Sequence, residues 1–264
     1  MDCLADLWPV FGLLIHTPRL RLRLPREDDL CELARAARII AAPGEPQLHL
    51  PWMYQSSPDM ERLFLQRYWR ALAHWKPESW HLPLAIYLDG RPIGIQDMWA
   101  SDFARIRSVG TGSWVTRSEQ GHGYGTEARI AVLELSFGHL GAEEACTEYL
   151  DGNHASEKVS RKLGYADNGQ HLVYRDDTRR TTEYRLRLDR QTWQENRDST
   201  PCVITGLAPC LAMFGLGNAS TTTDTEIPAA TRTQASPLPA RSTAVTPSSA
   251  PTSGRSRHAG CPRR

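Results

Sequence analysis

The chain has 264 residues, of which 40% are hydrophobic and 23% charged, and its formal net charge at pH 7 is +1. This composition is sufficient for a hydrophobic core, and the small net charge gives no electrostatic reason to expect binding to a membrane or to a specific nucleic acid. No uninterrupted apolar run approaches the roughly 20 residues of a membrane-spanning helix. Because the cysteines read as free thiols rather than bridges, a reducing, cytoplasmic setting is expected.

The first part of the chain predicts one strand and two helices. Residues 1–16 are expected to be a short lead-in. Leucines alternate with arginines over 19–24, which predicts a strand with one apolar face; its arginines could bind nucleic acid, but a solvated strand face is the simpler reading. Acidic residues at 27–29 precede apolar residues at helical spacing, which predicts a helix there. A second helix is predicted over 59–75.

The middle of the chain predicts most of a sheet. Strands are expected at 82–88, 93–99, 109–115, 145–150, 165–175 and 180–188. The Asp89-Gly90 pair predicts a tight hairpin between the first two of these strands. Helices are expected over 126–140, from Asn153 to the stop at Gly164, and over 189–197. An apolar segment over 206–216 is expected to pack back on the domain.

The composition changes at residue 218. The segment 218–264 is rich in Thr, Ser, Pro and Ala and contains no Phe, Tyr or Trp. Such a segment cannot bury enough apolar surface to offset its loss of conformational entropy on ordering. We therefore expect one folded domain over 17–217 and a basic disordered tail over 218–264, which is either without function or a weak docking arm.

A glycine-rich stretch joins the predicted strand 109–115 to the predicted helix 126–140. It reads Gln120-Gly121-His122-Gly123-Tyr124-Gly125-Thr126. Strand, glycine loop and helix in this order place backbone N–H groups and a positive helix end where a diphosphate can bind. The stretch is not a P-loop, because no Gly-Lys-Ser or Gly-Lys-Thr follows, and its alternating glycines differ from the dinucleotide fingerprint. Three glycines could also form only a flexible turn.

Three motifs together resemble the GNAT N-acetyltransferase superfamily. The spacing Gln120-x-x-Gly123-x-Gly125 is similar to the acyl-coenzyme-A loop of that family. The segment 153–165, Asn-His-Ala-Ser-Glu-Lys-Val-Ser-Arg-Lys-Leu-Gly-Tyr, resembles its later Asn-x-x-Ser and Lys-Leu-Gly-aromatic signature. The segment 17–23, Thr-Pro-Arg-Leu-Arg-Leu-Arg, is similar to the opening strand of the RimJ/RimL-like branch, the ribosomal-protein-alanine acetyltransferase type. The resemblance covers about residues 17–190 and keeps the family's motif order.

The resemblance implies an α+β fold with a mixed, mostly antiparallel central sheet flanked by helices. Two central parallel strands, here 109–115 and 145–150, would splay apart and hold the pantetheine arm between them. In this fold the segment after the first strand lines the acceptor pocket. The aromatic residues of that region are then pocket candidates, although each could equally be a packing residue: Trp52, Tyr54, Trp75 and Trp80.

The resemblance also implies an activity, the transfer of an acetyl group from the co-substrate acetyl-CoA to a primary amine in a ternary complex. The acceptor would be a protein N-terminal α-amine or a small-molecule amine. The residues that would bind the coenzyme are Trp114, Val115, Gln120, Gly121, His122, Gly123, Tyr124, Gly125, Thr126, Asn153 and Ser156.

Three catalytic roles follow from the same resemblance. The backbone N–H of Val115 or a neighbour would bind the thioester carbonyl. Ser156 would protonate the leaving thiolate, because Ser160 stands where many relatives carry a tyrosine acid. In a structural reading, Asn153 only caps a helix and Ser156 bonds within its first turn.

The general base is open among three carboxylates by position, Glu148, Asp97 and Glu119, and Glu148 is taken first. A chain of water molecules could also suffice.

Cofactors and partners are expected to be few. The six cysteines include no Cys-x-x-Cys pair and the nine histidines no His-x-x-x-His pair, so no metal is expected. The expected partners are acetyl-CoA and the amine acceptor, and the chain would be a monomer or a homodimer. Two alternatives stay open: a non-catalytic acyl-CoA sensor, and a small-molecule acetyltransferase of the antibiotic-modifying type.

Overall fold

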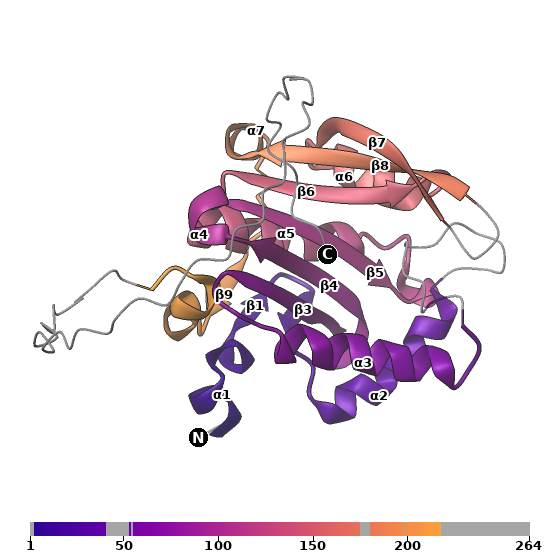
Figure 1. Ribbon diagram of the computed structural model, residues 1–264, viewed down its shortest axis with the longest axis horizontal. Coiled ribbons are helices and arrows are strands. Elements are labelled where there is room, and N and C mark those ends of the chain that lie inside the picture. The colour runs from indigo at the N-terminus through magenta and orange to yellow at the C-terminus, as the bar shows by residue number, and fades with distance from the viewer. Residues whose placement is uncertain (1–2, 41–52, 54, 175–179, 198, 218–264) are drawn as a thin grey trace, which may run out of the picture. The chain divides into compact units, whose positions relative to one another are not determined.

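The computed structural model describes residues 3–40, 53, 55–174, 180–197 and 199–217, and its centre is a nine-stranded sheet (Figure 1). The strand order is β7-β8-β6-β5-β4-β3-β2-β1-β9. The strands are β1 (Leu14–His16), β2 (Leu20–Arg23), β3 (Ser79–Leu88), β4 (Arg91–Ser101), β5 (Ser108–Val115), β6 (Glu144–Leu150), β7 (Ala166–Tyr174), β8 (Arg180–Asp189) and β9 (Val203–Thr205). Among the described strands only β5 and β6 pair in parallel, which confirms the predicted fold class.

Helices cover both faces of this sheet. The α-helices are α1 (Cys3–Leu7), α2 (Glu27–Ala36), α3 (Asp59–Ala73), α4 (Phe103–Ile106), α5 (Tyr124–Leu133), α6 (His154–Lys162) and α7 (Arg190–Glu195). The shorter or wider turns are η1 (Pro9–Gly12), η2 (Ala37–Ile39), η4 (Arg117–Glu119), η6 (Ala208–Phe214) and the wide helical segment η5 (Glu134–Leu140) that continues α5.

Two neighbouring residues of β5 show that α3 and α5 lie on opposite faces. The ring of Trp114 is 6.2 Å from the ring of Phe64 on α3. A Cβ placed on Gly125 of α5 would instead lie 3.9 Å from Val115 Cγ2. Because successive side chains of a strand point to opposite faces, α3 and α5 are separated by the sheet, as Figure 1 also shows.

The β3–β4 hairpin has the predicted tight turn and one irregularity. Asp89 and Gly90 have φ values of 49° and 83°, the positive pair that a type I′ turn requires. The strand register shifts by one residue next to Ile86, so that Pro83 rather than Leu82 lies opposite Asp97. This bulge decides which side chains of β3 share a face with Asp97.

The parallel pair β5–β6 separates after three residue pairs. Pairing runs from Ser108 with Glu144 to Gly110 with Cys146 and then stops. Beyond that point the Oγ1 atom of Thr147 donates to the carbonyl oxygen of Thr111 at 3.0 Å. We call the diverging segments 111–115 and 147–150 the wedge, and they confirm the predicted splayed pair.

The two ends of the described chain both contribute side chains to the hydrophobic core. Residues 3–16, expected only as a lead-in, include fully buried side chains and the strand β1, which pairs with β2 and β9. Trp75 stacks on Trp80 at 6.1 Å, and Phe214 packs 4.9 Å from Trp80. The pocket role considered for these two tryptophans is therefore wrong, because they are buried in an aromatic cluster.

Trp52 and Tyr54, like the predicted tail over 218–264, lie outside the described residues. Within the described helices, none is both long enough and apolar enough to cross a membrane.

Candidate functional site

The glycine stretch forms a loop that ends in the start of α5. Gly121 and Gly123 have φ values of 79° and 83°, where a side chain would be strained. The first backbone hydrogen bond of α5 runs from Glu127 N to Gly123 O at 3.0 Å. The N–H groups over 124–126 precede this bond and have no acceptor among the described residues. They form the kind of helix end that binds phosphate groups.

Gln120 ties this loop to the rest of the domain. Its Nε2 atom donates to the carbonyl oxygen of Val115 at 2.8 Å and to that of Ile40 at 2.6 Å. The side chain therefore bridges the end of β5 and the turn after α2. This is the contact pattern expected of a residue that orders the loop.

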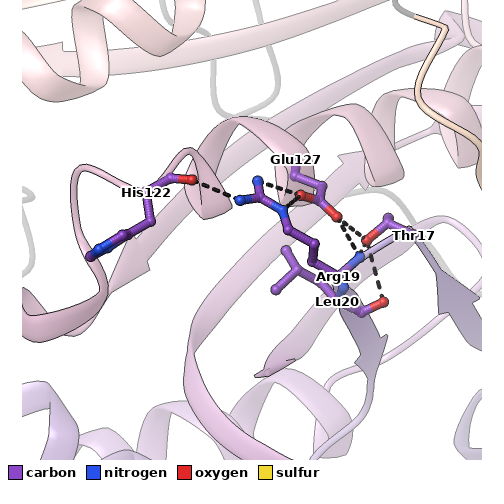
Figure 2. A network of polar contacts seen from close by, with 5 residues as sticks. All are labelled: Thr17, Arg19, Leu20, His122 and Glu127. Atoms are coloured by element: carbon purple, nitrogen blue, oxygen red, sulfur yellow. Dashed lines mark hydrogen bonds and ion pairs between the residues drawn. The ribbon is translucent and has the colours of Figure 1, made fainter. Parts of the chain in front are cut away.

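A buried carboxylate on α5, that of Glu127, is connected to the loop through Arg19 (Figure 2). One oxygen of Glu127 accepts hydrogen bonds from Thr17 Oγ1 at 2.6 Å and from Arg19 N at 3.0 Å. Its other oxygen accepts from Arg19 Nε at 2.6 Å. The same guanidinium donates from Nη1 to the carbonyl oxygen of His122 at 2.9 Å. The turn before β2 is thereby fastened to the glycine loop and to the first turn of α5.

These contacts add ion pairs to the arginine face at β2, on which Arg19 and Arg21 are exposed as predicted. Arg19 also lies 4.6 Å over the ring of Tyr124, and a Cβ on Gly123 would come within 3.4 Å of its Nη2 atom. Arg23 donates to the carboxylate of Asp29 at 2.9 Å. Two of the three arginines are therefore engaged in ion pairs rather than simply solvated, and Arg19 borders the expected diphosphate position.

The N–H group of Val115 points into the wedge. Thr116 N donates to the carbonyl oxygen of Ile93 at 2.8 Å, so it points toward β4. Because successive N–H groups of a strand point to opposite edges, that of Val115 points away from β4 and toward the diverging β6. This is the direction that an oxyanion donor in the wedge requires.

Asn153 and Ser156 lie at the start of α6, just after β6 ends. Asn153 Oδ1 accepts a hydrogen bond from Ser156 N at 3.2 Å, which is the capping contact of the structural reading. The hydroxyl of Ser156 has no hydrogen-bond partner among the described residues. Ser160 is buried and donates to the carbonyl oxygen of Ser156 at 3.0 Å, so its hydroxyl is already engaged.

A buried arginine, which the sequence reading missed, spans the wedge. Arg129 is 2% exposed. Its Nη1 atom donates to Thr147 Oγ1 on β6 at 3.1 Å, and its Nη2 atom donates to Ser113 Oγ on β5 at 3.3 Å. Its Nε atom is buried without a partner. Arg129 lies four residues before the buried Leu133, so helical spacing is the one sequence signal that could have placed it on the inner face.

A small pocket lies on the other face of β5. It is lined by Phe64, Arg67, Tyr68, Ala71, His81, Pro83, Ile95, Asp97 and Trp114, and its volume is about 20 Å³. Asp97 is 6% exposed, and its Oδ1 atom lies 2.6 Å from His81 Nε2. Arg67 Nη2 lies 3.6 Å from the other oxygen of Asp97. Because Trp114 immediately precedes Val115, the pocket and the wedge lie on two sides of the same strand.

The other two carboxylates considered as bases each pair with an arginine. Glu148 lies 3.3 Å from Arg185 on β8, and Glu119 lies 2.8 Å from Arg91. Glu148 faces the pocket side of the sheet, since Cys146 pairs with Gly110 and a Cβ on Gly110 would meet the Trp99 ring. The structure therefore places Glu148 and Asp97 on one face and Ser156 beyond the open end of the wedge.

No group of three His, Cys, Asp or Glu side chains within the described part of the chain is arranged to hold a metal ion.

Comparison with known proteins agrees with this geometry. Residues 19–166, more than half of the chain, match the sequence model of the acetyltransferase (GNAT) domain. RimJ of Mycobacterium smegmatis, solved in complex with CoA-disulfide, is 19% identical with a TM-score of 0.53, covering 69% of this chain and 90% of its own.

Two further solved structures have the same fold. A GCN5-related N-acetyltransferase from Brucella melitensis is 18% identical with a TM-score of 0.55, covering 69% of this chain and 80% of its own. The ribosomal L7/L12 alpha-N-protein acetyltransferase RimL is 15% identical with a TM-score of 0.53, covering 67% of this chain and 93% of its own. The chain belongs to the GNAT acetyltransferase family.

Proposed function

We propose that this protein transfers the acetyl group of acetyl-CoA to a primary amine by direct attack in a ternary complex, in the cytoplasm. The observation that carries the proposal is the continuity of two features along β5. The strand parts from β6 to open the wedge, and it then runs into a loop whose helix end offers free N–H groups over 124–126. A diphosphate and a thioester joined by a flexible arm match these two places.

The residues present fit the coenzyme. The N–H groups from His122 to Thr126 would hold the diphosphate, with Arg19 beside them as a cation. Asn153 uses its oxygen for the helix cap, which leaves its amide N–H groups for the carbonyl oxygens of the pantetheine arm. Trp114 and Val115 would form the strand edge along which that arm lies.

The chemistry exchanges one bond for another. The amine nitrogen attacks the thioester carbonyl carbon, a C–N bond forms, and the oxygen becomes an oxyanion that the N–H of Val115 stabilises by about 3 kcal/mol. The C–S bond then breaks. The departing thiolate takes a proton from the hydroxyl of Ser156, which is reprotonated from water, and the attacking nitrogen gives up its proton to a base.

His81 is the base that the geometry favours. Its imidazole lies in the pocket wall with Nε2 2.6 Å from the carboxylate of Asp97, so Asp97 orients the ring and leaves Nδ1 for the acceptor amine. Glu148 remains the alternative, because it faces the same side of the sheet, although Arg185 holds its carboxylate. Substituting His81 and Glu148 one at a time distinguishes the two candidate bases.

The pocket and the cost of deprotonation bear on the class of the acceptor amine. The described residues leave a cavity of about 20 Å³ there, roughly the space of one water molecule. Deprotonation at neutral pH costs about 1 kcal/mol for an α-amine and about 4 to 5 kcal/mol for a lysine. The lower cost of deprotonation supports a protein N-terminal α-amine, the acceptor class named for the fold relative RimL.

Gly123→Val is expected to weaken acetyl-CoA binding at least tenfold, or about 1.4 kcal/mol, as measured by calorimetry. The branched side chain would stand at a φ of 83° and beside the Arg19 guanidinium, where the diphosphate would lie. Gly169→Val is the matched control, because its φ is 94° with nothing near its Cβ. The Gly169→Val substitution should lower the stability of the fold and leave acetyl-CoA affinity unchanged. Unchanged affinity in a folded Gly123→Val protein would remove the diphosphate assignment.

The decisive experiment is an acceptor screen with acetyl-CoA, in which release of free coenzyme A thiol is measured. Peptides with N-terminal Ala or Ser are compared with N-acetylated peptides that contain lysine and with aminoglycoside-type amines. Thiol release that depends on a free peptide α-amine is the expected result. Release only with small amines would favour the antibiotic-modifying reading, and binding of acetyl-CoA without release on any acceptor would favour the sensor.

A further inference from the structure

Arg129 is a buried cation that pairs with no carboxylate among the described residues. Its guanidinium is 2% exposed and is held by two neutral hydroxyl groups, those of Ser113 and Thr147. No carboxylate in the described part of the chain forms an ion pair with it, and its Nε atom has no hydrogen-bond partner. A buried charge in this state is unfavourable unless an anion completes the site.

The nearest carboxylates along the chain are engaged elsewhere. Glu127 precedes Arg129 on the same helix, but both of its oxygens are taken by Thr17 and Arg19. Glu148 follows Thr147 on β6, but its side chain points to the opposite face of the sheet and pairs with Arg185. The charge of Arg129 is therefore left for a group that enters the wedge from outside.

We propose that the wedge also accepts acyl-CoA donors whose acyl group ends in a carboxylate, and that Arg129 binds this carboxylate. The proposal rests on the proposed function, since it uses the same thioester position. A guanidinium is a planar fork that matches a carboxylate better than a neutral carbonyl. The hydroxyl of Ser113 accepts from Arg129, so its own proton is available to the same carboxylate.

The position of Arg129 favours a four-carbon acyl group. Ser113 precedes Val115 by two residues along β5, or about 6.6 Å at about 3.3 Å per residue. A thioester carbonyl at the N–H of Val115 would thus be separated from the guanidinium by a short spacer and one hydrogen bond. A succinyl group, which has two methylene groups between its carbonyl and its carboxylate, has this form.

The bond changes are those of the acetyl transfer. The amine nitrogen attacks the thioester carbon, the C–S bond breaks, and the thiolate is protonated. The carboxylate at the far end takes no part in bond making and remains ionised in the product, an N-succinyl amide. No further reactant is needed, so Arg129 determines which acyl group is accepted rather than how it is transferred.

The test compares succinyl-CoA with butyryl-CoA, which has the same number of acyl carbons and a methyl group in place of the carboxylate. The kcat/KM ratio of succinyl-CoA to butyryl-CoA is measured on the unmodified chain, on Arg129→Met and on Arg129→Lys. The expected ratio is about tenfold or more in the unmodified chain, close to one or inverted in Arg129→Met, and partly restored in Arg129→Lys. Arg105→Met, which removes an exposed arginine of α4, is the control for net charge and should keep the ratio.

Calorimetric binding of the two thioesters repeats the comparison without turnover. It keeps the test valid if no acceptor is found, and the donor preference of the unmodified chain keeps it valid if Arg129→Met does not fold. Equal or better use and binding of butyryl-CoA by the unmodified chain would overturn the proposal. So would a preference for succinyl-CoA that Arg129→Met retains. Absence of turnover with acetyl-CoA would count against the proposed function and not against this inference.

Discussion

His81→Asn is expected to lower kcat about 100-fold near pH 7, at the low end of general-base effects. Asparagine is shorter than histidine and has no atom at the position of Nε2, which lies 2.6 Å from Asp97 Oδ1 in the parent protein, and its amide cannot take a proton from the acceptor amine. The deficit should shrink as the pH rises beyond about 8, because a growing fraction of an α-amine is then neutral in solution. Initial rates of thiol release across this pH range measure the effect.

The control for this change is His139→Asn, which alters an exposed histidine at the end of η5. It should leave the rate and its pH dependence as they are. If His81→Asn keeps full turnover at neutral pH while Glu148→Gln loses it, the base is Glu148, and the pocket pair only shapes the acceptor site.

Ser156→Ala is also expected to lower kcat about 100-fold, while acetyl-CoA affinity stays nearly unchanged. The hydroxyl has no partner among the described residues, and it would act only when the thiolate departs. Removing a contact that forms mainly in the transition state lowers kcat rather than binding. Coenzyme A is a fair leaving group, because the pKa of its thiol is close to that of free cysteine, about 8.5. The decrease in kcat should therefore be moderate. Single-turnover rates and calorimetry measure the two quantities.

Two neighbouring substitutions make the Ser156 result specific. Asn153→Ala should weaken acetyl-CoA binding and cost about 1 kcal/mol of stability, because it removes both the pantetheine contact and the helix cap. Ser160→Ala should lower stability only, since its buried hydroxyl is already bonded to the carbonyl of Ser156. If the Ser156→Ala protein is destabilised but keeps full turnover, the Ser156 hydroxyl only makes a contact within the first turn of the helix and does not act as the acid.

Local patterns in the sequence were enough to predict the sheet and the loop. Alternation, helical spacing and turn residues give most strands and helices within a few residues, and the glycines at 121 and 123 have the positive φ that such a loop requires. The parallel pair and its separation followed from the family resemblance rather than from spacing. The individual strands, the helices and the glycine loop are determined by residues close together in the chain, which is why one sequence suffices to predict them.

The pairing of His81 with Asp97 could not be predicted in the same way. A regular hairpin centred on Asp89-Gly90 would place Leu82 opposite Asp97, which puts His81 on the other face of the sheet. The bulge next to Ile86 shifts the register by one residue and brings His81 to the face of Asp97. The extra residue of the bulge is Ile93, which stands between Pro92 and Gly94 on β4. Gly or Pro inside a strand is a local sign of a bulge, but it does not fix the register, so the pairing of His81 with Asp97 had to come from the structure.

Arg129 escaped prediction for a different reason. Its position on the inner face of α5 follows from its spacing to Leu133, but composition rules place arginine outside unless a partner is known. The hydroxyl groups that hold it come from two strands that are far apart in sequence. Glu127 is a similar case, since its partners Thr17 and Arg19 lie more than a hundred residues away.

The strand order has a consequence for what can be produced as an independent fragment. The family match ends at residue 166, but β8 lies between β6 and β7 and pairs with β6 along its whole length, from Glu144 with Asp189 to Leu150 with Glu183. A fragment limited to 19–166 would expose the N–H and C=O groups of β6 in the middle of a sheet and lose the fully buried Phe214. The segment that matches the family model is therefore smaller than the smallest fragment expected to be stable, which must extend at least through η6.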